Sequence, residues 1–139
     1  PFNVRLLAHD PAADRVFAES KGVRLISLDD LLGQSDVVSL HLPLTPATKN
    51  ILDEATLALM KPTTVLINTA RGGLIDENAL LAALDADRLA GAALDAFAEE
   101  PTKNARLLSH PKILATPHIG GSTEEAILAM GRAAIAGLG

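Results

Sequence analysis

The feature that most constrains the fold is a regular alternation between short apolar runs and segments with helical patterning. The clearest run is TVLINTA (residues 64–70), whose centre is continuously apolar, as expected of a parallel strand covered on both faces. Strands that alternate with helices form βαβ units around a parallel sheet, with right-handed crossovers. We therefore predict an α/β fold with three layers, in which helices cover both faces of a parallel sheet.

The other elements follow the same rhythm along the chain. Strands are predicted over residues 4–10, 23–26, 36–42, 64–70, 89–97 and 112–117. Helices are predicted over residues 11–20, 27–32, 53–60, 76–86 and from residue 122 onward. Four start signals support these helices: Pro11 at a first helical position, Ser27 with Asp30, Asp53, and a capping box formed by Ser122 and Glu125.

Bulk properties exclude several function classes. The chain has 139 residues, which predicts a single domain over residues 1–139. A formal net charge of −5 without a cluster of Lys and Arg disfavours a nucleic-acid partner. No apolar run reaches the roughly 20 residues of a membrane span, no metal-ligand spacing is found, and no signal peptide precedes Asp10. The chain has no cysteine, which fits a cytoplasmic protein.

Candidate functional residues stand where the predicted strands end. In parallel α/β sheets, sites lie at the carboxyl ends of the strands. Three residues there can share chemistry: Arg71, Glu100 and His118. Each also has an ordinary structural interpretation, as a surface cation, a solvated turn residue and a packed histidine. Their placement at one edge of one predicted sheet favours the shared site.

Several blocks of the sequence resemble one enzyme family. NTARGGLIDENALLAAL, GAALDAFAEEP and ATPHIGGST are similar to signature blocks of the NAD-dependent D-2-hydroxyacid dehydrogenases, and VVSLHLPLTPATKNILDEATLALMKP is similar just upstream. The resemblance covers roughly residues 4–136. The block HIGGSTEEA is nearest to the phosphoglycerate dehydrogenase branch, which makes 3-phosphoglycerate the expected substrate.

The resemblance implies a role for each matching residue. His118 matches the acid/base histidine, Glu100 its carboxylate partner, and Arg71 the arginine that holds the substrate carboxylate. Asp95 matches a residue at the nicotinamide carboxamide, and Asp10 matches the acid that accepts hydrogen bonds from the adenosine ribose. Asp10 therefore favours NAD over NADP. The remaining matches line the cofactor with backbone: Leu42, Pro43, Thr69, Ala70, Gly120 and Gly121.

Elementary chemistry agrees with these roles. Oxidation of a 2-hydroxy acid removes a hydroxyl proton as hydride leaves the same carbon, and a histidine suits that proton transfer at neutral pH. A carboxylate on the other ring nitrogen fixes the tautomer, and a planar guanidinium binds a carboxylate through two parallel hydrogen bonds.

The glycine-rich phosphate loop of the family has no counterpart here. It should precede Asp10 by roughly 20 residues, yet only nine residues precede Asp10 and none is glycine. We expect a Rossmann-like domain that lacks its first strand and its separate substrate domain. One hypothesis is that the sheet closes to the flavodoxin-like strand order 2-1-3-4-5; the other is that another chain or segment fills the gap.

These expectations leave two functional classes open. The chain is either part of a D-2-hydroxyacid dehydrogenase that by itself binds NAD weakly and has little activity, or a non-catalytic scaffold or protein-interaction module of the same family. The joint presence of Arg71, Glu100 and His118 favours the first. The relatives are commonly dimers, which makes a homodimer one expected state.

Overall fold

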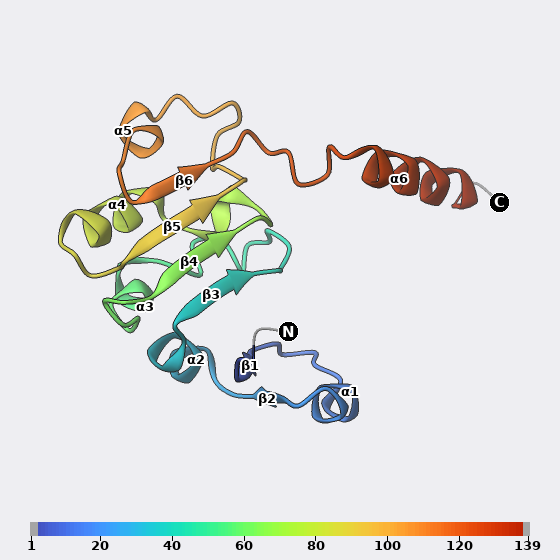
Figure 1. The fold of residues 1–139 in the computed structure, drawn as a ribbon, viewed down its shortest axis with the longest axis horizontal. Coiled ribbons are helices and arrows are strands. Elements are labelled where there is room, and N and C mark those ends of the chain that lie inside the picture. Colours follow the sequence, from blue (N-terminus) through green and yellow to red (C-terminus); the bar gives the residue numbers. More distant parts are fainter. Residues whose placement is uncertain (1–2, 138–139) are drawn as a thin grey trace.

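The computed structural model describes residues 3–137 and consists of parallel strands with helices between them (Figure 1). The strands are β1 (Leu6–Ala8), β2 (Val23–Leu25), β3 (Val37–Leu40), β4 (Val65–Asn68), β5 (Gly91–Leu94) and β6 (Ile113–Ala115). The helices are α1 (Arg15–Ser20), α2 (Leu28–Gln34), α3 (Glu54–Leu57), the short 3₁₀ turn η1 (Gly72–Leu74), α4 (Glu77–Asp85), α5 (Ala105–Leu108) and α6 (Glu124–Ala136). The parallel, Rossmann-like arrangement with helices on both sides confirms the predicted fold class.

The strands form two separate sheets rather than one closed sheet. β1 pairs with β2, and the order β3-β4-β5-β6 makes up the larger sheet. All four pairings are parallel, with Leu6 opposite Val23 in the small sheet and Val65 opposite both Val37 and Gly91 in the large one. The hypothesis that β1 and β3 pair to give the order 2-1-3-4-5 is therefore wrong. A cavity of about 550 Å³ lies between these two strands, lined by Val4, Leu6, Asp36, Val37 and their neighbours.

Helix α2 is held against the larger sheet. Leu32 on this helix is fully buried in the core of the larger sheet. The Lys61 ammonium donates to the Gln34 carbonyl at 2.9 Å and pairs with Asp36 at 2.6 Å, which ties the end of α2 and the start of β3 to the segment before β4. Helix α2 thus packs with the larger sheet, whereas β2, which precedes it in the chain, pairs with β1.

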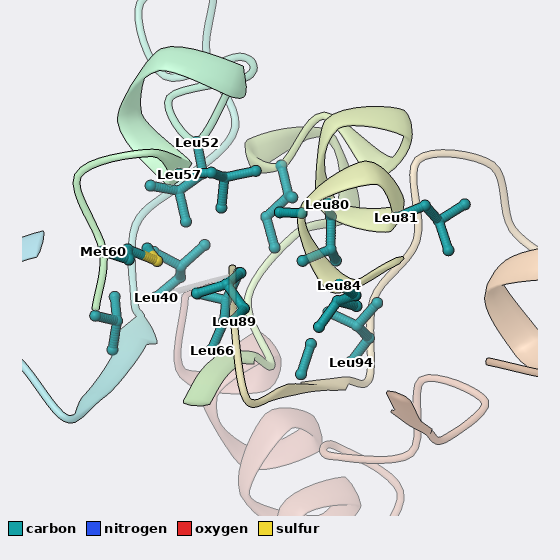
Figure 2. Packing of buried hydrophobic residues seen from close by; sticks show 14 of the residues in the cluster. Leu40, Leu52, Leu57, Met60, Leu66, Leu80, Leu81, Leu84, Leu89 and Leu94 are labelled. Carbon is teal, nitrogen blue, oxygen red and sulfur yellow. The ribbon is translucent and has the colours of Figure 1, made fainter. Parts of the chain in front are cut away.

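The hydrophobic core lies on one face of the four-stranded sheet (Figure 2). Leu66 from β4 and Leu94 from β5 point into it and meet Leu57, Leu80 and Leu84 from helices α3 and α4. Alternate residues along the strands point the other way, as the pleat requires. On that second face Val37 and Leu114 remain 57% and 68% exposed, so the helices cover the two faces unequally.

Two helix starts differ from the prediction for local reasons. Asp10 accepts the backbone N–H of Ala12 at 2.8 Å, so Pro11 lies in a turn and α1 begins after Asp14, whose side chain caps it. Helix α6 begins after Thr123, whose hydroxyl accepts from Ala126 at 3.2 Å. This register puts Glu125 one position too early for the capping box predicted with Ser122.

The other caps are confirmed, and two short elements were not predicted. Ser27 bonds Asp30, and Asp53 forms a capping box with Thr56. The turn η1 and the four-residue helix α5 were missed because neither is long enough to show helical periodicity. Within residues 3–137, no helix has the length and apolar character needed to cross a bilayer.

Because one face of the sheet is buried and the other is exposed, shortening a side chain should destabilise the protein more on the buried face. Leu66→Ala, at a fully buried position, should lower the free energy of unfolding by about 2–5 kcal/mol through the cavity it leaves. Leu114→Ala, on the exposed face, is the matched control and should cost about 0.5 kcal/mol or less. Urea denaturation of both variants measures the difference. Equal losses would contradict the placement of the core.

Candidate active site

The carboxyl ends of the four strands lie in one row, and this row builds the site. Leu40, Asn68, Leu94 and Ala115 are successive register partners across β3, β4, β5 and β6. The loops that follow these residues therefore start at the same edge of the sheet. Three of these loops begin after Asn68, Leu94 and Ala115, which are 26 and 21 positions apart in sequence, yet they start at this one edge.

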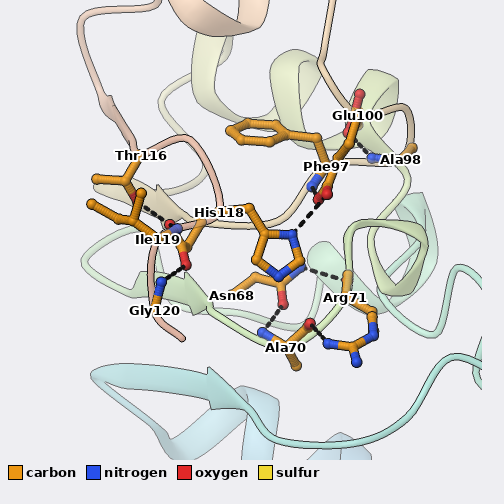
Figure 3. Close-up of polar contacts among 12 residues, drawn as sticks. Asn68, Ala70, Arg71, Phe97, Ala98, Glu100, Thr116, His118, Ile119 and Gly120 are labelled. Atoms are coloured by element: carbon orange, nitrogen blue, oxygen red, sulfur yellow. Dashed lines mark hydrogen bonds and ion pairs between the residues drawn. The ribbon is translucent and has the colours of Figure 1, made fainter. Parts of the chain in front are cut away.

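His118 and Glu100 form a direct pair at this edge (Figure 3). The imidazole Nδ1 lies 2.7 Å from Glu100 Oε2, and both side chains are partly exposed, at 42% and 38%. The other carboxylate oxygen accepts the backbone N–H of Phe97 at 2.9 Å. With Nδ1 bonded to a carboxylate, the second ring nitrogen of His118 is left to face a ligand.

The surroundings of Glu100 favour its ionised form. The backbone N–H of Phe97 is the first cause that lowers the pKa of the Glu100 carboxyl, and the hydrogen bond to His118 is the second. The positive charge of Arg71 is the last contribution that lowers the pKa of Glu100. The loops that carry Arg71, Glu100 and His118 start at one edge of the sheet, and Figure 3 shows the three side chains close together.

Arg71 leaves β4 on a turn shaped by a buried asparagine. Asn68 is fully buried; its amide nitrogen donates to the Arg71 carbonyl at 2.8 Å and its amide oxygen accepts from Ala70 N–H at 3.1 Å. The guanidinium itself is exposed and donates to the Ala70 carbonyl at 2.6 Å (Figure 3). It makes no ion pair with a carboxylate among residues 3–137. Its remaining N–H donors are available to a ligand.

Asp95 holds the loop that carries His118. Its Oδ1 accepts the Thr116 hydroxyl at 2.6 Å and the Ile119 N–H at 2.9 Å, and its Oδ2 accepts the Gly120 N–H at 2.8 Å. The Thr116 hydroxyl is the main cause that lowers the pKa of Asp95, although partial burial acts in the opposite direction. His118 lies between these anchors with φ 54°, a left-handed conformation that costs a non-glycine residue about 1–2 kcal/mol.

Other predicted cofactor residues line the same edge with their backbone. Leu42 and Ala70 are half-buried, Thr69 and Pro43 are exposed, and the Pro43 carbonyl accepts the Thr48 hydroxyl at 2.7 Å. Gly120 has little room for a side chain, because an added Cβ would lie 3.0 Å from Asp95 Oδ2. Gly121 follows it and is exposed.

Asp10 is the one predicted site residue that the larger sheet does not position. It follows β1 at the end of the two-stranded sheet. It lines a cavity of about 300 Å³ with His9, Arg15 and Ser27. The structure thus divides the predicted residues into one set at the ends of β3 to β6 and Asp10 at the end of β1.

A cavity lies beside the histidine, and neither Arg71 nor Asp95 lines it. It measures about 530 Å³, and its walls include Phe97, Leu108, Ala115 and Thr116, with His118 and Glu100 at one side. Its lining is largely apolar, as is usual for small-molecule sites with a few placed polar groups. Among residues 3–137, no three His, Asp or Glu side chains are arranged to hold a metal ion.

Sequence reasoning missed the residues that shape these loops. No side-chain partner was predicted for Asn68 or Thr116, although both stand at strand ends: buried Asn68 bonds the backbone of Ala70 and Arg71, and half-buried Thr116 donates to the Asp95 carboxylate. Gly72 was also missed. An added Cβ there would lie 1.8 Å from the Phe97 carbonyl carbon, so only glycine lets the β4 and β5 loops approach this closely.

The anchoring role of Asp95 leads to a pH-dependent prediction. Asp95→Asn cannot accept from both the Ile119 and Gly120 amides, so it should lower the free energy of unfolding by about 1–3 kcal/mol at neutral pH. Because the folded pKa of Asp95 lies below its ordinary value of 3.8, this stabilisation is present above pH 4 and is lost as pH falls through the folded pKa.

The measurement is urea denaturation of both proteins between pH 3 and pH 7. The difference between them should shrink at the acid end. Asp29→Asn, at an exposed position in the first turn of α2, is the control and should show little difference throughout. A difference for Asp95→Asn that stays constant with pH would contradict the charged anchor.

Comparisons with known proteins agree with this geometry. Residues 1–120 match the family model described as D-isomer specific 2-hydroxyacid dehydrogenase, NAD binding domain. D-3-phosphoglycerate dehydrogenase 2, chloroplastic, of Arabidopsis thaliana is 51% identical over 122 residues, which are 87% of this chain and 20% of that protein. The chain thus spans about a fifth of the length of this curated relative.

Solved structures share the fold as well. Apo D-mandelate dehydrogenase of Rhodotorula graminis superposes with a TM-score of 0.87 at 36% identity, over 93% of this chain and 38% of that one. D-lactate dehydrogenase of Aquifex aeolicus, complexed with NAD and lactic acid, gives 0.86 at 30% identity, over 97% and 45%. The family match covers most of the chain and the solved relatives repeat its architecture, so the chain belongs to the NAD-binding domain family of the D-isomer-specific 2-hydroxyacid dehydrogenases.

Proposed function

We propose that the chain supplies the catalytic face of an NAD-dependent oxidoreductase that moves a hydride between nicotinamide and a D-2-hydroxy acid. The observation that carries this proposal is the His118–Glu100 pair, with 2.7 Å between Nδ1 and Oε2, in the same site as the Arg71 guanidinium. A base, its orienting carboxylate and a carboxylate-binding cation are the groups that this reaction needs.

His118 is the proposed acid/base. In the oxidation direction it takes the proton of the substrate hydroxyl on Nε2, while Glu100 stabilises the resulting imidazolium through Nδ1. In the reduction direction it returns that proton to the 2-keto oxygen. NAD, when bound, accepts the hydride from the carbon that bears the hydroxyl, so the protein contributes orientation and charge.

Arg71 is the proposed substrate anchor. A guanidinium can hold the substrate carboxylate through two parallel hydrogen bonds and fix the reacting carbon relative to His118. In this structure one of its nitrogens donates to the Ala70 carbonyl, a bond to its own neighbour that a charged ligand can replace.

The residues proposed to hold NAD fit a cofactor that lies along the strand ends. Gly120, where an added Cβ would crowd Asp95, would let the backbone approach the cofactor. Asp10 would accept from the adenosine ribose, and its carboxylate disfavours a 2′-phosphate. The other proposed contacts are Leu42, Pro43, Thr69, Ala70, Asp95 and Gly121.

The proposed substrate is 3-phosphoglycerate. Its support is that the first curated relatives, from Arabidopsis thaliana, Synechocystis and Methanocaldococcus jannaschii, are D-3-phosphoglycerate dehydrogenases. The solved relatives act on other acids of the same class by name, including D-mandelate and D-lactate. All three acids are 2-hydroxy acids, so the relatives agree on the substrate class and differ in the individual acid. A cytoplasmic location and a homodimer stay predictions.

We expect this chain by itself to bind NADH weakly. Asp10 belongs to the small sheet, and β1 has no pairing with β3, so the two ends of the cofactor site are not tied to one sheet. Titration of the 139-residue chain with NADH, followed by nicotinamide fluorescence, should give a dissociation constant well above micromolar. Micromolar binding would overturn this part of the proposal.

The catalytic roles are testable in a chimera. This chain replaces the matching segment of the Methanocaldococcus jannaschii D-3-phosphoglycerate dehydrogenase, to which it is 44% identical over 131 residues. The chimera should oxidise 3-phosphoglycerate with NAD. His118→Gln should lower kcat about 10²–10⁴-fold, whereas Arg71→Lys should mainly raise KM because the paired hydrogen bonds are lost.

Arg24→Lys on β2 is the matched control for Arg71→Lys, because both variants keep the positive charge. It should leave kcat and KM unchanged. A chimera that folds and binds NAD but keeps full activity without His118 would refute the proposed role of the histidine. A chimera that folds and binds NAD, yet turns over no 2-hydroxy acid, would favour the non-catalytic scaffold.

A further inference from the structure

A glutamate outside the catalytic trio contacts the loop that carries Glu100. Glu77 is the first residue of α4, and its Oε1 accepts the backbone N–H of Ala98 at 2.7 Å. The two residues are 21 positions apart in sequence, so this bond joins the start of a helix to the β5 loop. Figure 3 shows Ala98 next to the Glu100 side chain.

Two neighbouring amides of that loop are bonded by two different carboxylates. Phe97 N–H donates to Glu100 and Ala98 N–H donates to Glu77. The first bond folds the Glu100 side chain back over its own turn, and the second fixes the turn against α4. Because Glu100 has its other oxygen on His118, the orientation of this turn decides whether the imidazole pair can form.

Helix α4, which begins at Glu77, is fixed by its packing and its cap. Leu80, Leu81 and Leu84 on the helix are buried in the core, and the Asp76 side chain caps the helix by accepting from Asn78 and Ala79. A carboxylate in the first turn is also stabilised by the helix dipole. The packing of α4 in the core thus fixes the backbone of Glu77, from which the carboxylate reaches the loop.

The β4 loop is held to the same point. Gly72 packs directly against the Phe97 and Ala98 backbone, which leaves no space for a side chain. Arg71 precedes this glycine, so the contact fixes the spacing between the Arg71 loop and the Glu100 loop. Glu77 and Gly72 together hold the β5 loop from two adjoining segments, η1 and the start of α4.

We propose that Glu77 is a positioning residue of this site: by holding the Ala98 amide it orients the Glu100 turn so that the Glu100 carboxylate meets His118. The inference rests on the proposed function for its catalytic meaning. Its structural content concerns only the Glu100–His118 pair, which can be measured without substrate or cofactor.

The test is an NMR comparison of the 139-residue chain with Glu77→Ala, Glu77→Gln and Glu54→Ala. Glu54 is the matched control because it also follows a capping aspartate as the first residue of its helix, α3, and is exposed. Three quantities are measured: amide exchange at Ala98, the carboxyl titration midpoint of Glu100, and the Nδ1 chemical shift of His118.

In Glu77→Ala, Ala98 should exchange about tenfold faster. The Glu100 midpoint should rise toward its ordinary value of 4.5, and the Nδ1 shift of His118 should move toward that of an unpaired imidazole. Glu77→Gln should restore most of the three readings because its amide oxygen can accept from the same N–H. If the alanine variant fails to fold, Glu77→Met takes its place, because it keeps the length of the side chain but has no oxygen to accept from the Ala98 N–H. Glu54→Ala should match the unchanged chain.

Faster exchange at Ala98 with no change at Glu100 or His118 would overturn the proposal, because the bond would then be structural only. Equal changes in Glu54→Ala would also overturn it, since the cause would be the helix terminus in general. In the chimera, Glu77→Ala should lower kcat more than it changes KM for the hydroxy acid. If the NMR readings change but the unaltered chimera is inactive, the proposed function fails and the positioning inference stands.

Discussion

The site depends on one nearly buried carboxylate at the end of β5. Asp95 accepts three hydrogen bonds from the loop after β6, from the Thr116 hydroxyl and from the amides of Ile119 and Gly120. Between these anchors His118 takes a left-handed backbone conformation that the residue would not prefer by itself. The anchor compensates for that strain and keeps the imidazole directed toward Glu100. In the resemblance Asp95 had a role toward the cofactor; the structure adds this role toward the protein.

The parallel ladder explains how distant residues reach one place. Asn68, Leu94 and Ala115 stand side by side in the register of β4, β5 and β6, so their following loops begin at the same height. Arg71, Glu100 and His118 each come from a different loop of this row. Polar side chains then shape each loop: buried Asn68 the first, half-buried Glu77 the second and buried Asp95 the third. The exposed reactive side chains are thus supported by less exposed hydrogen-bonding partners.

The two ends of the site differ in how completely this chain builds them. The proposed catalytic end belongs to a four-stranded sheet with a continuous leucine-rich core beneath it. The nucleotide end depends on Asp10, at the end of β1 in a separate two-stranded sheet. This division agrees with a chain that spans only part of its relatives, 20% of the Arabidopsis protein and 25% of the Methanocaldococcus one.

The sequence by itself determined the class of fold, the order of the strands and of the longer helices, and the choice of Arg71, Glu100 and His118 as candidate site residues. Strand and helix periods, strand-end positions and the family blocks are all local patterns, so TVLINTA and the Ser27 and Asp53 caps could be interpreted without coordinates. Local patterns did not fix where every helix begins. Turns at Asp10 and Ser122 move the starts of α1 and α6 away from the predicted positions.

Only the tertiary structure decided which strands pair and what holds the loops. The hypothesis of a closed sheet was wrong: β1 and β3 do not pair within residues 3–137, and strand pairing joins segments far apart in the chain that no local pattern relates. The roles of Asn68, Gly72, Glu77 and Thr116 were invisible for the same reason. Each depends on a backbone group that folding brings within hydrogen-bond or van der Waals distance, and no local pattern of residues encodes that distance.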